Sequence, residues 1–96
     1  MIEIDVEMFE VKDYERDSMP SVKIWSKPDC SETFFEEFRN WGSEFLLESD
    51  EICLYFKGIS KIDDIYMDEE MVSIKIFSNG YPEWFKSKDE FLKFKI

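Results

Sequence analysis

The sequence feature that most constrains the fold is a period-two alternation of apolar and polar side chains, which recurs in several separate runs. In the clearest run, residues 2–8, the apolar residues Ile2, Ile4, Val6 and Met8 alternate with the acidic residues Glu3, Asp5 and Glu7. Successive side chains of a β-strand point to opposite faces, so this pattern is typical of a strand with one buried face and one solvated face. The phase then slips, because Phe9 and Val11 are apolar on the other parity. We therefore expect a bulge or bend near Met8 and Phe9.

The same alternation predicts further strands. They cover residues 21–25, 44–48, 51–57, 61–67 and 71–77. Turns are expected at Ser49-Asp50 and at 68–70, which makes two hairpins, and Asn79-Gly80 is a strong turn signal. The polar residues 12–20 end in a proline and are expected to form a loop.

Two segments carry helix signals. In residues 27–32, Asp29 or Ser31 can cap a helix, and Glu32 follows Asp29 at the capping-box spacing. Apolar residues at positions 34, 35, 38 and 41 then form one helical stripe. This helix can end at a left-handed cap on Gly42 or continue to about Leu47, and we favour Gly42. A second capping box at residues 87–90 predicts a short C-terminal helix.

This order of elements predicts an α+β fold in a single domain that covers residues 1–96. The expected sheet is mostly antiparallel and meander-like, with about five to six strands, one main helix after the second strand and a short C-terminal helix. Because 44% of the residues are hydrophobic and 18% are aromatic, intrinsic disorder is excluded despite the high charge.

The charge of the chain limits its partners. Asp and Glu total 23 against 12 Lys and Arg, which gives a formal net charge of −11. This charge repels nucleic acid and anionic membranes, so a direct complex with either is not expected. The chain has no apolar run of membrane-spanning length and no signal-peptide pattern, and its two cysteines form no metal motif. We expect a cytoplasmic protein of a bacterial cell, and residue usage typical of A/T-rich codons fits a phage-encoded gene.

Catalytic signatures are missing from the sequence. The chain has no histidine, so the usual general base near neutral pH is absent, and its three glycines form no phosphate-binding loop. A carboxylate pair such as Asp63-Asp64 can in principle hold Mg²⁺ or act in acid–base chemistry, but nothing marks it above other pairs. We therefore expect no enzyme activity, no cofactor and no metal site.

The acidic residues are unevenly distributed. Residues 1–70 contain 20 acidic and 7 basic residues, whereas residues 71–96 contain 3 acidic and 5 basic residues. Three clusters are candidate partner-binding sites: the first-strand face Glu3, Asp5 and Glu7; the helix and following segment with Glu32, Glu36, Glu37, Glu44 and Glu48, joined by Asp50 and Glu51; and the segment Asp63, Asp64, Asp68, Glu69 and Glu70. Carboxylates at these spacings lie about 6–7 Å apart, similar to the phosphates of one nucleic-acid strand. The alternative is an acidic surface that only maintains solubility.

Aromatic residues form a second set of candidates. Trp25 and Tyr55 fall on the side of a predicted strand opposite to the clearest apolar stripe. Exposed rings of this kind anchor protein interfaces. The alternative is that the two helices cover both sheet faces and bury these rings.

The overall profile resembles that of stoichiometric protein inhibitors of basic targets. These include phage anti-restriction and anti-CRISPR proteins that mimic nucleic acid, and immunity proteins that neutralise nuclease toxins. The resemblance implies a basic protein partner, either a nuclease or another nucleic-acid-binding effector. The alternative is a non-catalytic structural or regulatory subunit, monomeric or homodimeric, that uses its aromatic surface, and a carboxylate-based metal-dependent enzyme is least favoured.

Overall fold

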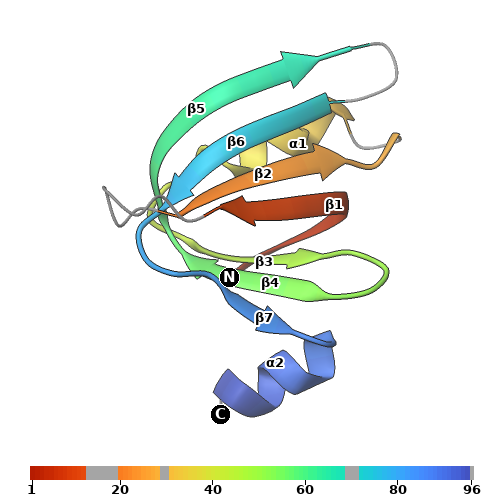
Figure 1. Cartoon of the computed structure of the whole chain (residues 1–96), viewed down its shortest axis with the longest axis vertical. Helices are drawn as coiled ribbons and strands as arrows, with labels where there is room; N and C mark the ends of the chain where they lie inside the picture. The colour runs from red at the N-terminus through yellow and green to blue at the C-terminus, as the bar shows by residue number, and fades with distance from the viewer. Residues whose placement is uncertain (13–19, 29–30, 69–71, 96) are drawn as a thin grey trace.

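The computed structural model describes residues 1–12, 20–28, 31–68 and 72–95. Its strands form one seven-stranded sheet in the spatial order β5-β6-β2-β1-β3-β4-β7 (Figure 1). The elements along the chain are β1 (Ile2–Lys12), β2 (Ser21–Ser26), α1 (Ser31–Glu37), β3 (Glu44–Glu48), β4 (Cys53–Lys57), β5 (Ile59–Met67), β6 (Val72–Ser78), β7 (Glu83–Phe85) and α2 (Lys88–Lys95). The two predicted hairpins are confirmed, since β3 pairs with β4 and β5 with β6, both antiparallel.

A bend in β1 organises the sheet. Residues 2–5 pair with β3 in parallel, whereas residues 6–12 pair with β2 in antiparallel orientation. The register shifts between Val6 and Met8, which confirms the predicted bulge. A bulge bends its strand and increases the local twist, and Figure 1 shows β1 turning sharply. The bend separates a first half-sheet (β1–β3–β4–β7) from a second half-sheet (β1–β2–β6–β5).

The inner faces of both half-sheets share one hydrophobic core with α1. Val6, Val22 and Ile74 are fully or almost fully buried there. Beside them lies a column of four buried rings: Phe34 of α1, Phe38 just after this helix, Phe45 of β3 and Phe56 of β4. The centroids of successive rings in this column are 5.2, 5.7 and 5.1 Å apart. This column fastens the short helix to the first half-sheet.

A smaller cluster lies on the outer face of the first half-sheet, beneath α2. Phe91 of α2 is completely buried, with its ring centroid 5.0 Å from Tyr55 and 5.3 Å from Phe85. The helix begins where the capping box predicts, because the Glu90 backbone N–H donates to the Ser87 hydroxyl oxygen at 3.2 Å. The predicted C-terminal helix is therefore confirmed. The thiol of Cys53 in this cluster is free and buried, whereas Cys30 lies outside the described residues.

The predicted antiparallel meander is wrong in one respect. The sheet is mixed, because β1 and β3 are parallel, and it has seven strands, β7 being the short additional one. The cause is the connection between β2 and β3. After the antiparallel β1–β2 hairpin, the chain passes through α1 to the opposite edge of β1, and β3 then enters parallel to β1.

The first helix is also shorter than predicted. It ends at Glu37 and is no longer than α2, so it reaches neither Gly42 nor Leu47. The side-chain amide of Asn40 donates to the Glu37 carbonyl at 3.2 Å, and such a bond competes with the helical pattern. Beyond it, the Trp41 carbonyl accepts the Ile59 N–H at 2.8 Å, so this segment pairs with the start of β5.

Gly58 joins the two half-sheets at the point where β4 passes into β5. Its φ is +78°, a left-handed conformation that side chains other than glycine rarely adopt. A Cβ atom there would lie 2.6 Å from Asn79 Nδ2 and 3.0 Å from the Trp41 carbonyl oxygen. The left-handed helix cap predicted at Gly42 is wrong, because the glycine with a positive φ is Gly58, between two strands.

We predict that Gly58→Ala lowers the free energy of unfolding by about 1–3 kcal/mol, because it adds both backbone strain and a steric clash. Gly42→Ala is the matched control, since a Cβ atom at Gly42 meets nothing within 4 Å. The control should change stability by no more than about 0.5 kcal/mol. Urea unfolding of both variants checks this, and equal effects would contradict the role assigned to Gly58.

Candidate functional site

Four of the predicted acidic residues lie on the outer face of the first half-sheet, the face that α2 covers. They are Glu3, Asp5, Glu44 and Glu48. The parallel register places Glu3 opposite Leu46 and Asp5 opposite Glu48. Two strands that are distant in sequence thus bring their carboxylates to one surface.

Two lysines of α2 bind this acidic surface. Lys88 Nζ lies 2.5 Å from Glu3 Oε1, and Lys95 Nζ lies 2.6 Å from Glu44 Oε2. The hydrogen bonds from Lys95 and Tyr55 lower the pKa of Glu44, and the hydrogen bond to Glu3 raises the pKa of Lys88. Glu3 and Glu44 therefore already have cationic partners within the chain.

Tyr55 is part of the packing beneath α2. Only 6% of the residue is exposed, and its hydroxyl donates to Glu44 Oε1 at 2.6 Å. Burial and this hydrogen bond raise its pKa to about 12. Tyr55 is therefore buried under a helix, which is the alternative that the sequence left open. A partner cannot reach its ring while α2 is in place.

On the same outer face Glu48 is half-buried and Cys53 is buried. Burial raises the pKa of Glu48, with Asp5 and Glu3 adding to the effect and Lys88 opposing it. Burial also raises the pKa of the Cys53 thiol. Both shifts run opposite to the lowered thiol or carboxyl pKa typical of an activated nucleophile or a strong ion pair.

An acidic groove lies at the bend of β1, away from α2. Its volume is about 410 Å³, and three carboxylates line it, Glu7 from β1 with Asp50 and Glu51 from the β3–β4 turn. Apolar side chains of Met8, Phe9 and Ile52 complete the lining, with Ser49. We call these seven residues the acidic groove.

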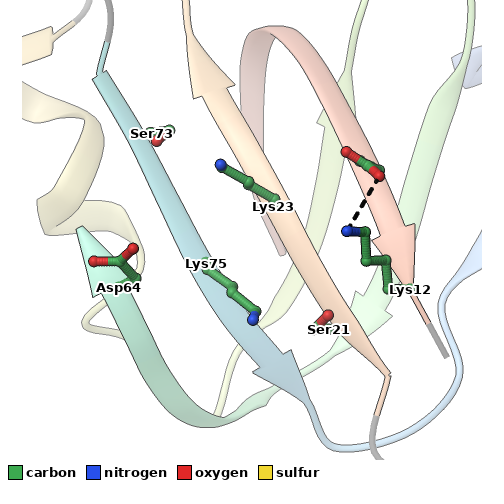
Figure 2. Close-up of a pocket in the computed structure, with 7 residues that line it drawn as sticks. Lys12, Ser21, Lys23, Asp64, Ser73 and Lys75 are labelled. Atoms are coloured by element: carbon green, nitrogen blue, oxygen red, sulfur yellow. Dashed lines mark ion pairs between the residues drawn. The ribbon is translucent and has the colours of Figure 1, made fainter. Parts of the chain in front are cut away.

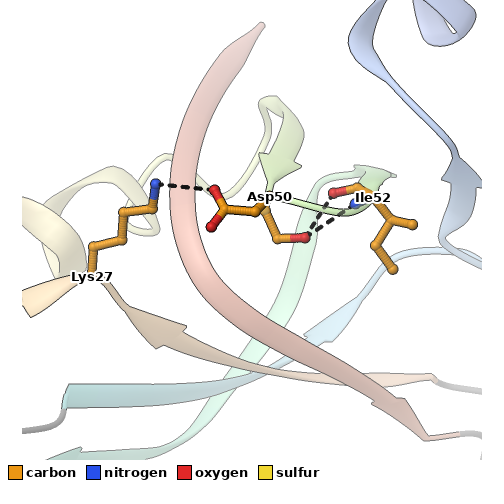
Figure 3. Close-up of polar contacts among 4 residues, drawn as sticks. Lys27, Asp50 and Ile52 are labelled. Carbon is orange, nitrogen blue, oxygen red and sulfur yellow. Dashed lines mark hydrogen bonds and ion pairs between the residues drawn. The ribbon is translucent and has the colours of Figure 1, made fainter.

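Hydrogen bonds of Ser49 close the β3–β4 turn, which carries Asp50 and Glu51 of the groove. The Ser49 hydroxyl donates to the Ile52 carbonyl at 3.0 Å, and the Ile52 N–H donates back to it at 3.3 Å (Figure 3). Lys27 Nζ approaches Asp50 at 3.9 Å, but the Asp50 side chain is 95% exposed, so this ion pair is weak. The groove therefore keeps its negative charge.

An exposed aromatic ring extends the groove. Trp84 of β7 is 51% exposed, and its ring centroid lies 5.3 Å from that of Phe9. Asp50 and Glu51 were recognisable in the sequence as acidic, but their meeting with Glu7, Met8 and Phe9 was not. Only the parallel β1–β3 pairing brings the β3–β4 turn to the bend of β1.

The remaining candidates are dispersed. Asp63 stands at a second bulge, in β5, and pairs with Lys61 at 3.5 Å and with Lys75 at 3.6 Å. Asp64 and Asp68 are exposed on or just after the same strand, and Glu69 and Glu70 lie outside the described residues. Glu36 and Glu37 are exposed at the end of α1, and Glu32 lies near its start. Trp25 is half-buried on the outer face of the second half-sheet, with Lys23 Nζ 5.0 Å from its ring centroid.

Two further observations concern the described part of the chain. It contains no group of three or more Cys, Asp or Glu side chains arranged to hold a metal ion. Neither of its helices has the length and apolar composition needed to cross a bilayer.

Comparison of the chain with protein-family models, with curated proteins and with solved structures found no match in any of the three.

We predict that stability falls as pH rises from 10.0 to about 12, because the folded state retains the Tyr55 proton that the unfolded chain releases. The raised pKa of Lys88 acts in the same direction, since its stabilising charge is lost as pH rises through its folded pKa. Tyr55→Phe should therefore reduce the fall without abolishing it. Unfolding free energies measured across this range check the prediction.

Tyr81→Phe is the matched control for this experiment, because Tyr81 is exposed. The control should reproduce the pH dependence of the unaltered protein. An unchanged slope in Tyr55→Phe would show that the buried hydroxyl does not link protonation to folding.

Proposed function

We propose that the protein is a stoichiometric inhibitor that binds a basic protein through the acidic groove. The observation that carries this proposal is the meeting of three carboxylates with exposed apolar side chains in one groove. Protein interfaces combine an apolar centre with a polar rim, and aromatic and methionine side chains are enriched in them. Met8 and Phe9 supply such contacts, and Glu7, Asp50 and Glu51 supply the charged rim.

The electrostatic state of the groove distinguishes it from the other acidic surface. Glu3 and Glu44 have lysine partners from α2, so a basic target would have to displace α2 to reach them. In the groove, Lys27 is the only described cation with an ion pair to a lining carboxylate, and that pair is long. The groove can therefore accept external lysine or arginine side chains without breaking a strong internal contact.

The proposed target is a nuclease or another nucleic-acid-binding effector. Such proteins carry a basic cleft for phosphates, and a chain with a net charge of −11 is attracted to that cleft over long distances. Complementary charge speeds the encounter, and apolar contacts at the centre of the groove hold the complex. The inhibitor would then block the cleft as a nucleic-acid mimic or cover it as an immunity protein does.

We predict that Asp50→Lys/Glu51→Lys abolishes inhibition in a panel of purified basic nucleases, restriction enzymes and RNA-guided nucleases, assayed by cleavage of nucleic acid. Reversing both charges places two cations in the groove, which repels a basic target. Glu36→Lys/Glu37→Lys is the matched control, because it makes the same change in net charge at an exposed pair on α1. The control should retain most of the inhibition.

Salt dependence separates the groove from a purely apolar contact. Inhibition of a susceptible nuclease should weaken between about 0.05 M and about 0.5 M salt, because screening shortens the range of the attraction. Equal loss in the two double variants would contradict the groove as the binding surface. Absence of inhibition across the whole panel would count against the proposed target class.

A second candidate function is that of a regulatory subunit or homodimer that associates through β5. This strand forms one edge of the sheet, and Ile65, Tyr66 and Met67 near its end are exposed, Met67 to 69%. A long edge strand with apolar side chains can add a strand from another chain. Association of this kind depends on backbone hydrogen bonds and apolar contact, so it resists salt.

We predict for this second function a dimer that light scattering detects at both low and high salt, and that Ile65→Lys dissociates into monomers. The lysine adds a charge to the apolar part of the edge and blocks pairing. Leu92→Lys, at an exposed position on α2, is the control and should leave the dimer intact. A monomer at every protein concentration would exclude this candidate.

A further inference from the structure

The outer face of the second half-sheet differs in composition from the rest of this acidic chain. The strand register aligns its outward side chains in three rows: Lys12, Ser21, Phe77 and Lys61; Glu10, Lys23, Lys75 and Asp64; and Met8, Trp25, Ser73 and Tyr66. Within the described residues no helix covers this face, because α1 packs on the inner faces and α2 on the first half-sheet. We call it the lysine–aromatic face.

A depression of about 210 Å³ lies in the middle of this face. Its two smallest lining side chains, Ser21 and Ser73, are 2% and 3% exposed, and they leave space between the longer side chains around them. Figure 2 shows Lys23 and Lys75 on neighbouring strands between these two serines. Lys12 also lines the depression, and its amino group pairs with Glu10 at 3.8 Å.

The arrangement of charge around the depression is unusual for a sheet. Lys23 and Lys75 are direct cross-strand partners, a like-charge pair that is unfavourable by itself. Lys75 is compensated by Asp63 at 3.6 Å, whereas Lys23 has no ion pair among the described residues. The two side chains extend in opposite directions, Lys23 toward Trp25 and Lys75 toward Phe77, and an anion held by both would compensate their charges (Figure 2).

Carboxylates limit the size of this positive zone. In the central row, Glu10 lies beyond Lys23 at one end and Asp64 beyond Lys75 at the other. The zone is therefore two lysines wide, which matches a single phosphate group. A longer phosphate chain would extend over the carboxylates and be repelled.

Two aromatic rings contact the lysines that line this depression. The amino group of Lys23 lies 5.0 Å from the Trp25 ring centroid, and that of Lys75 lies 5.7 Å from the Phe77 ring centroid. These contacts place ring faces directly beside the lysines that would hold a phosphate. Nucleobases stack on aromatic rings, and Trp25 and Phe77 are partly exposed, so a ring next to two lysines suits a ligand that carries both a phosphate and a base.

We propose that the lysine–aromatic face binds a nucleoside monophosphate, with its phosphate between Lys23 and Lys75 and its base against Trp25. This site is separate from the acidic groove and does not depend on the proposed inhibitor function. The bounding carboxylates and the net charge of −11 favour a free mononucleotide over a nucleic-acid strand or a triphosphate.

Fluorescence titration tests the proposal with a single reporter. The chain has three tryptophans, and Trp41→Phe/Trp84→Phe leaves Trp25 as the only one, since the two replaced rings are exposed. Adenosine monophosphate should quench Trp25 in a saturable manner. Lys23→Met/Lys75→Met in the same background should weaken binding by about tenfold or more, because each amino group makes a charge-assisted contact with phosphate.

Lys86→Met/Lys93→Met is the matched control, because it removes the same charge from exposed residues near and on α2. It should leave the affinity unchanged, and circular dichroism should show that both double variants are folded. A loss of affinity equal in the two variants would overturn the site, because it would reflect net charge alone.

Titration with related ligands shows whether the site prefers a mononucleotide over its parts or over longer phosphate chains. Inorganic phosphate, adenosine, adenosine triphosphate and a short single-stranded oligonucleotide should all bind more weakly than adenosine monophosphate. Tighter binding of the oligonucleotide would overturn the commitment to a free nucleotide in favour of a strand. Phosphate that binds as tightly as the nucleotide, or no quenching at millimolar nucleotide, would overturn the proposal.

Discussion

The bulge between Val6 and Met8 is the constraint on which the rest of the structure depends. It allows one strand to pair in parallel with β3 through its first half and in antiparallel orientation with β2 through its second half. Without the bend, β1 would present one continuous outer face. With it, the sheet has two outer faces, one covered by α2 and the other uncovered by any described helix, and the acidic groove forms at the bend itself.

The division of charge along the chain has a structural consequence. The basic C-terminal segment folds back as α2 onto the acidic face of the first half-sheet, where Lys88 and Lys95 pair with Glu3 and Glu44. The aromatic contacts of Phe91 with Tyr55 and Phe85 hold the helix there. Part of the negative charge of the chain is thus neutralised by its own lysines. The carboxylates at the bend of β1 have no comparably short ion pair with a described lysine.

Several local features could be predicted from the sequence because local chemistry decides them. The alternation in residues 2–8 predicted a strand and its phase slip predicted the bulge, and the Ser87 capping box predicted the start of α2. Other features depend on residues far apart in the sequence. A glycine is required at position 58 because its φ is positive and because Trp41 and Asn79 occupy the space of a Cβ atom, and α1 ends early because the Trp41 carbonyl pairs with Ile59.

The candidate site residues also divide into properties that the local sequence decides and properties that contacts between distant residues decide. The sequence by itself determined which side chains are acidic, how apolar and polar side chains alternate along the strands, and where every strand except β7 lies, because these properties follow from neighbouring residues. Only the tertiary structure decided that β3 joins the edge of β1 opposite to β2, that Tyr55 is buried, and that Glu7 meets Asp50 and Glu51. The choice of strand edge depends on the packing of α1 and its column of phenylalanine rings, which no local pattern encodes.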